Sequence, residues 1–286
     1  ILYFASEGKK GELPSYLSKG FLKSGFFVFR NSWGEDATQM VVKAGPKAFW
    51  HCQPDNGTFE MWFNGKNLFP DSGSYVYAGS KEVNEERNWF RQTAVHNTLT
   101  LNNKNLDQTN SKTLLWQPEG DIQTLVTENP SYKNLTHRRS IFFVNNTYFV
   151  IVDEAIGAAK GFVNLHYQMP KGKIANSRED MTFVTEFESG SNMKLQCFGP
   201  DGMSMKKEEG WASTAYRKKF KRMNVSFNVK KEDDAVRYIT IIYPMKDSAD
   251  APSMSAKFKT KKFDGKNLEV EVKVGGKKQS LKYTLQ

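Results

Sequence analysis

Short runs of β-branched and aromatic residues recur along the chain, and this pattern restricts the fold more than any other feature. Runs such as FFVFR (26–30), SIFFV (140–144) and YFVIV (148–152) alternate with turn dipeptides such as NG, NN, DG and GG. The residues of the runs favour strands, and the dipeptides favour tight hairpin turns. We therefore predict an all-β fold, a large antiparallel β-sandwich, from about residue 25 onward.

The chain divides into three predicted parts. Residues 1–24 combine charged turns with little periodicity and are expected to be a linker or the end of a preceding domain. Residues 25–170 are expected to form the main sandwich, in which the NNT turn joins SIFFV to YFVIVDEA as a hairpin and the apolar run YFVIV lies in the interior. Residues 171–286 are expected to supply the remaining sandwich strands and a C-terminal sheet.

Charge suggests an anionic partner without identifying it. The 286 residues carry 41 Lys and Arg against 31 Asp and Glu, a net charge of +10, which suits nucleic acid, a membrane surface or an acidic polysaccharide. Most basic runs, such as YRKKFKR, adjoin acidic or turn residues and are interpreted as solvated strand faces and loop tips. No run approaches the ~18 apolar residues of a membrane span. No signal peptide is expected in this sequence, which says little if the chain is a processed or truncated product.

Two histidines and a carboxylate form a candidate metal site. His51 opens HCQPD, Asp71 lies in the turn PDSG, and His96 lies in HNT. Two imidazoles and one carboxylate suit zinc and leave one coordination position open. The three residues are far apart in sequence, so only the fold could bring them together. Alternatively, the histidines are ordinary surface or core residues, and Asp71, like Asp55, only stabilises a turn.

Other residues could also take part in binding. Cys52 follows His51, so on an extended strand it would face the other way and is expected to be a buried structural thiol. The run HRR at 137–139 could bind an oxyanion or could simply be a charge cluster at a strand entry. His166 lies in an apolar strand and is expected to be a core histidine. The run NWFR, which ends at Arg91, pairs an aromatic platform with a cation, which suits acidic sugars or could simply close the end of the sandwich.

Three elements in a fixed order carry a family resemblance. WHCQPDNGTFEMW begins at residue 50, FPDSGSYVY at residue 69 and WFRQTAVHNTL at residue 89. Together they resemble the C-terminal β-sandwich part of the heparinase II/III-like polysaccharide lyases, and the resemblance continues through HRRSIFFVNNTYFVIVDEA. It covers most of the chain from about Gly25 to His166. It implies cleavage of heparan sulfate by β-elimination at uronic acid, which gives 4,5-unsaturated products. A lyase for another uronate polymer, such as heparin or alginate, and a non-catalytic module that binds anionic polysaccharides are the alternatives.

The resemblance also implies roles for individual residues. His51, Asp71 and His96 would bind a divalent metal, zinc or alternatively calcium, that is mainly structural. His51 is also the first candidate for proton chemistry in the substrate cleft, and His137 is the second. The candidates for substrate binding are Arg91, Tyr77 and Arg138.

The resemblance places the main catalytic groups outside this chain. β-Elimination requires neutralisation of the uronate carboxylate, removal of the C5 proton and protonation of the leaving oxygen. In the family these tasks fall largely to a preceding α/α toroid domain, so the isolated chain is expected to be inactive. The expected partners are a sulfated glycosaminoglycan and that toroid, with no nucleic acid and no membrane. The protein is expected to be a monomer in the bacterial periplasm or secreted.

Overall fold

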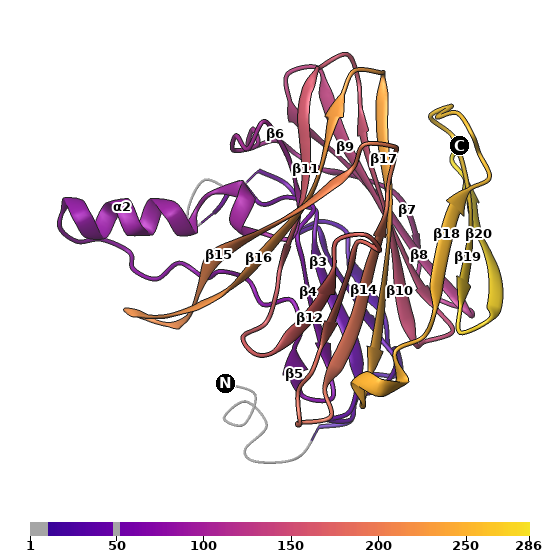
Figure 1. Ribbon diagram of the computed structural model, residues 1–286, viewed down its shortest axis with the longest axis horizontal. Coiled ribbons are helices and arrows are strands. Elements are labelled where there is room, and N and C mark those ends of the chain that lie inside the picture. The colour runs from indigo at the N-terminus through magenta and orange to yellow at the C-terminus, as the bar shows by residue number, and fades with distance from the viewer. Residues whose placement is uncertain (1–10, 48–51) are drawn as a thin grey trace.

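The computed structural model describes residues 11–47 and 52–286, and four antiparallel sheets contain its strands (Figure 1). The central eight-stranded sheet has the order β12 (Ile174–Ser177), β13 (Thr182–Thr185), β14 (Asn192–Phe198), β17 (Ala235–Met245), β10 (Tyr148–Ile156), β9 (Leu135–Val144), β8 (Ile122–Tyr132) and β7 (Lys112–Gln117). A four-stranded sheet has the order β15 (Ser204–Ala215), β16 (Lys218–Lys231), β11 (Gly161–Gln168) and β6 (Leu99–Leu101).

Two further sheets complete the fold. A five-stranded sheet contains, in order, β1 (Lys19–Phe21), β2 (Phe26–Arg30), β3 (Thr38–Lys43), β4 (Phe59–Phe63) and β5 (Lys66–Asn67). A three-stranded sheet contains β18 (Met254–Phe258), β19 (Asn267–Val274) and β20 (Lys277–Thr284). The described helices are α2 (Lys81–Phe90) and the 3-10 turns η1 (Thr93–Val95) and η2 (Ser248–Asp250).

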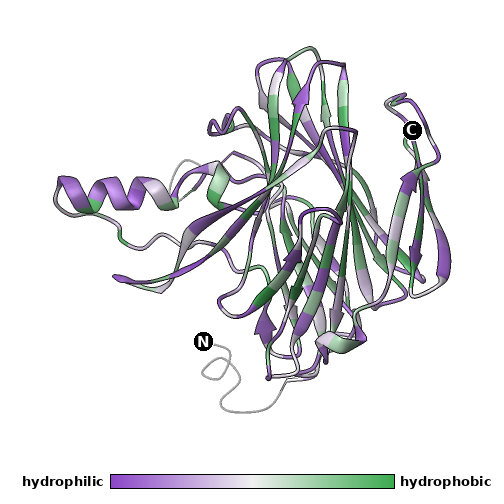
Figure 2. Ribbon diagram, in the orientation of Figure 1, coloured by the Kyte–Doolittle hydropathy of each residue, from purple (hydrophilic) through white to green (hydrophobic). Residues whose placement is uncertain are grey.

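The eight-stranded sheet is covered on both faces. The four- and five-stranded sheets pack on one face through a large apolar core, and the three-stranded sheet packs on the other through a smaller one. The sequence of β10 explains why both faces of the sheet are covered. Phe149 and Ile151 point into the large core, and Val150 and Val152 point into the small one. A strand that is buried on both faces needs a continuous apolar run rather than an alternating one. Figure 2 shows the corresponding hydrophobic colour along the central strands.

The structure confirms the predicted all-β class and the predicted hairpin, in which Tyr148 of β10 pairs with Val144 of β9. Regular structure begins earlier than predicted, because β1 starts at Lys19 and pairs with β2. Strands from either side of residue 171 pair directly, β10 with β17 and β11 with β16. The two predicted sandwich segments therefore share their sheets.

Helix α2 was not predicted from the sequence. Its residues KEVNEERNWF are mostly polar and only Phe90 is buried, so the apolar periodicity that indicates a helix is weak. Ser80 marks its start, because the Ser80 hydroxyl accepts a hydrogen bond from the Val83 amide at 3.5 Å. Within residues 11–47 and 52–286, no helix has the length and apolar character that crossing a bilayer would require.

Candidate functional site

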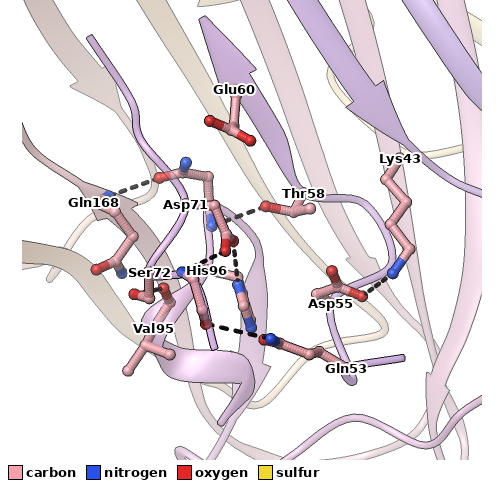
Figure 3. Close-up of polar contacts among 12 residues, drawn as sticks. Lys43, Gln53, Asp55, Thr58, Glu60, Asp71, Ser72, Val95, His96 and Gln168 are labelled. Carbon is pink, nitrogen blue, oxygen red and sulfur yellow. Dashed lines mark hydrogen bonds and ion pairs between the residues drawn. The ribbon is translucent and has the colours of Figure 1, made fainter. Parts of the chain in front are cut away.

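Asp71 and His96, two of the three predicted metal ligands, meet in the fold. Asp71 lies in the segment between β5 and α2, and His96 directly follows η1. Asp71 Oδ2 lies 2.7 Å from His96 Nδ1, and His96 is 1% exposed (Figure 3). His51, the third predicted ligand and first predicted catalytic residue, lies outside the described residues. The fold therefore unites residues that are distant in sequence, which spacing alone could not establish.

The turn that carries Asp71 is fixed from three sides. The Gly73 amide donates to Asp71 Oδ1 at 2.6 Å, and the Ser72 hydroxyl donates to the Val95 carbonyl at 2.7 Å. The Ser213 amide of β15 donates to the Ser72 carbonyl at 2.9 Å. Gly73 has a φ of +77°, and a Cβ atom there would lie 2.2 Å from the Ser213 carbonyl oxygen. Only glycine fits this position, both for its conformation and for its close approach to β15.

Arg222 of β16 holds the same turn and was missed by the sequence analysis. Its Nη1 donates to the Pro70 carbonyl, and its Nη2 donates to the Ser72 hydroxyl at 2.6 Å. Burial lowers the pKa of Arg222 to about 10, against the attraction of Asp71 and Glu60, so the guanidinium stays charged at neutral pH. Nothing in the local sequence YRKKFKR distinguishes this buried arginine from its solvated neighbours.

If the full-length protein cleaves a polysaccharide, as the family resemblance implies, we expect Arg222→Met to slow that cleavage by about 10- to 100-fold, because a displacement of about 1 Å at a reacting site can cost that much. The methionine fills similar space but releases the residues on both sides of Asp71. Initial rates of cleavage measure the effect. Lys221→Met is the matched control, since the Lys221 side chain is 62% exposed. Equal rates in the two variants would contradict the assigned role.

The electrostatics of the pair leave one nitrogen of His96 for a ligand. Burial disfavours charge on both groups, but their mutual attraction raises the pKa of His96 and lowers that of Asp71. His96 Nε2 is buried and has no hydrogen-bond partner among the described residues. A metal-binding histidine commonly has this arrangement, with one nitrogen bound to a carboxylate and the other facing the ion. His96 Nε2 thus fits a metal ligand.

Asp71 fits an orienting role better than a direct ligand role in this geometry. Its Oδ1 accepts from Gly73 and its Oδ2 contacts His96. Among residues 11–47 and 52–286, no three His, Cys, Asp or Glu side chains gather as a metal site. His51 lies outside the described residues, so its part in a metal site stays a prediction.

Neighbouring positions behave partly as predicted (Figure 3). Asp55 forms a 2.5 Å ion pair with Lys43, and its carbonyl accepts from the Thr58 amide as in a turn. The predicted burial of Cys52 is wrong, because the residue is only partly buried and lies outside any strand. Arg91, a predicted substrate ligand, donates from Nη2 to the Cys52 carbonyl at 3.3 Å. This contact holds the end of α2 against the segment that follows His51.

The HRR run faces protein carboxylates on both sides of β9. His137 and Arg139 point to one side, where His137 Nε2 lies 2.6 Å and Arg139 Nε 2.7 Å from Asp153 Oδ1. Arg138 points to the other side and contacts Glu128 with Nε at 2.8 Å. His137 is 2% and Arg138 6% exposed. The predicted cleft role of His137 and substrate role of Arg138 therefore gain no support from their positions, which favour the alternative charge cluster.

Tyr77 and His166 occupy opposite environments. Tyr77 is 61% exposed, and its ring stacks on Tyr216 with centroids 6.4 Å apart, so it remains a candidate for substrate contact. His166 is 2% exposed, its Nε2 lies 2.8 Å from the Thr100 hydroxyl, and burial lowers its pKa to about 3. The predicted core position of His166 is confirmed.

The layered antiparallel fold and the buried Asp71–His96 pair define a β-sandwich module with a buried polar site. The chain belongs to the family "Heparinase II/III-like, C-terminal", whose model matches residues 14–257. It is 79% identical over 286 residues, its whole length, to a heparin-sulfate lyase of Bacteroides stercoris, and covers 43% of that protein. It is 38% identical over 283 residues to a heparin-sulfate lyase of Pedobacter heparinus, and again covers 43%.

Solved structures agree with this assignment. A heparinase III structure matches with a TM-score of 0.96 and 79% identity, over 99% of this chain and 45% of that one. The heparan sulfate lyase HepC of Pedobacter heparinus matches with a TM-score of 0.92 and 36% identity, over 100% of this chain and 45% of that one. The chain thus spans less than half the length of these relatives.

Proposed function

We propose that the full-length protein is a polysaccharide lyase that cleaves heparan sulfate by β-elimination at uronic acid, and that this chain is its β-sandwich portion. The observation that carries the proposal is the 79% identity to a heparin-sulfate lyase along the whole chain. The surplus of basic residues, 41 against 31 acidic ones, suits a sulfated polymer. The other groups needed for proton transfer belong to the part of the protein outside this chain, for which an α/α toroid is the proposed architecture.

Within the chain, the Asp71–His96 pair is the proposed structural metal site. His96 Nε2 would bind the ion and Asp71 would orient the imidazole, with His51 as the proposed further ligand. The ion, zinc or alternatively calcium, would supply a positive charge that fixes this surface. His51 also remains the proposed donor of a proton in the cleft. A periplasmic or secreted location accords with an extracellular polymer as substrate.

We expect the full-length protein to release unsaturated uronate from heparan sulfate, which is measured as ultraviolet absorbance. The isolated chain should release none, because the proposed base lies elsewhere. Heparin and alginate, assayed in parallel, test the choice of polymer. Binding without cleavage by the full-length protein would favour a non-catalytic binding module instead, and cleavage by the isolated chain would refute the proposed division of labour.

A further inference from the structure

A second polar site lies on the same sheet face, away from the Asp71–His96 pair. A groove of about 780 Å³ is lined by residues of β11, β15 and β16, by Asn102 and Asn103 directly after β6, and by Arg178 directly after β12. Its floor includes Asn164 and Asn228, whose side-chain amides bond to each other, and its rim includes Lys206 and the exposed ring of Phe162. The volume lies in the range of ligand sites in proteins.

The chemistry of the groove suits an acidic carbohydrate. Asparagine amides both donate and accept hydrogen bonds, as sugar hydroxyls do. Arginine and lysine side chains suit sulfate and carboxylate groups, and Lys206 is 62% exposed although it also pairs with Glu208 of the same rim at 2.5 Å. Arg178 is exposed and forms no ion pair within the described part of the chain. Phe162 is 55% exposed and supplies an aromatic ring on which a sugar could stack.

A row of buried polar residues links the groove to the Asp71–His96 pair. Asn164, His166 and Gln168 alternate with core residues along β11, so they lie on the side of the sheet opposite the large core, where they are 6%, 2% and 0% exposed. At the far end of this row, the backbone amide of Gln168 donates to Asn97 Oδ1 at 2.6 Å, and Asn97 directly follows His96 in the chain. Asn164 and Gln168 are four positions apart, which is about 13 Å at the usual rise of a strand. Several linked sugar rings span such a distance, so a polymer bound at the surface near the pair would be long enough to reach the groove.

We propose that this groove is a distal subsite, which holds a sulfated part of the polymer several sugar units away from the cleavage point. The proposal rests on the proposed lyase function and adds a position at which chain length and sulfation are recognised. The remaining part of the protein is the competing occupant of the groove. The exposed rim, and the Arg178 side chain that has no ion pair among residues 11–47 and 52–286, favour the carbohydrate.

The test compares long and short substrates in the full-length protein. For the double variant Arg178→Ala/Lys206→Ala and for Phe162→Ala, we expect KM for polymeric heparan sulfate to rise about 3- to 10-fold, because rim contacts of this kind are individually weak. KM for a tetrasaccharide and kcat for both substrates should stay unchanged. The control Lys277→Ala/Lys282→Ala removes the same charge from β20, on the separate three-stranded sheet.

An equal rise of KM for polymer and tetrasaccharide would assign the groove to contact with the rest of the protein and overturn the proposal. An unchanged KM for both substrates would overturn it as well. Calorimetric binding of a heparan sulfate octasaccharide separates this inference from the lyase function. If the wild type binds the octasaccharide and the groove variants bind it about 3- to 10-fold more weakly, the subsite holds even in a protein that cleaves nothing. Equal affinity in wild type and variants would refute the subsite whether or not the protein is a lyase.

Discussion

Replacing Asp153 with alanine should lower the melting temperature of the protein by about 10 °C, because loss of one partner from a buried ion pair costs about 3–5 kcal/mol. Asp153 is fully buried and accepts from both His137 and Arg139. Without it, the Arg139 guanidinium stays in the core with no countercharge.

The damage should also reach the functional site. Arg139 Nη1 donates to the carbonyls of Gly57 at 2.5 Å and Asn97 at 2.6 Å. Gly57 closes the turn that contains Asp55, and Asn97 follows His96. The pair with Asp153 thus orients the arginine that joins the eight-stranded sheet to the two segments around the site. Loss of the pair should therefore also reduce the cleavage rate at temperatures at which the variant is still folded.

Thermal unfolding followed by circular dichroism measures the change, and cleavage rates at 25 °C measure the effect on the site. Asp250→Asn is the control, because Asp250 is exposed on η2. The double variant Asp153→Ala/Arg139→Met removes both charges and should recover part of the lost stability. A variant Asp153→Ala as stable as Asp250→Asn would show that the cluster contributes nothing.

The strands were predictable because their physical cause is local. Apolar content, β-branched residues and turn dipeptides mark β10, β17 and β19 directly in the sequence. Strand β15 and helix α2 lack these signals. KKEEGWASTA is stabilised by its long pairing with β16, and α2 by its cap and by Phe90. Such tertiary contacts override a weak local preference.

The site was predictable only in part, for a related reason. The family motifs identified Asp71 and His96, but which nitrogen of His96 faces a ligand depends on the position of Asp71 in the fold. Arg222 acts on residues about 150 positions away, so no window of sequence could reveal its role. The arginines of HRR were equally ambiguous, because the carboxylates that neutralise them lie on neighbouring strands.

Replacing His96 with alanine should remove the proposed divalent metal and reduce the proposed cleavage of heparan sulfate by at least about 100-fold. The substitution deletes the proposed ligand atom Nε2 and the partner of the Asp71 carboxylate together. Asp71→Asn should be milder, because an amide oxygen still accepts a hydrogen bond from Nδ1. Loss of such a supporting carboxylate typically costs 10- to 100-fold in metal affinity.

Metal content after dialysis and zinc affinity by competition with a chelator measure the two effects separately from cleavage. His166→Gln is the control, because it replaces another buried histidine in a different setting and should keep the metal. Wild-type metal content in His96→Ala would refute the ligand role. If the wild-type protein contains no metal and still cleaves at its full rate, the proposed metal site is refuted. If Asp71→Asn matched His96→Ala in metal loss, Asp71 would be a direct ligand and not the orienting group that its two hydrogen bonds indicate.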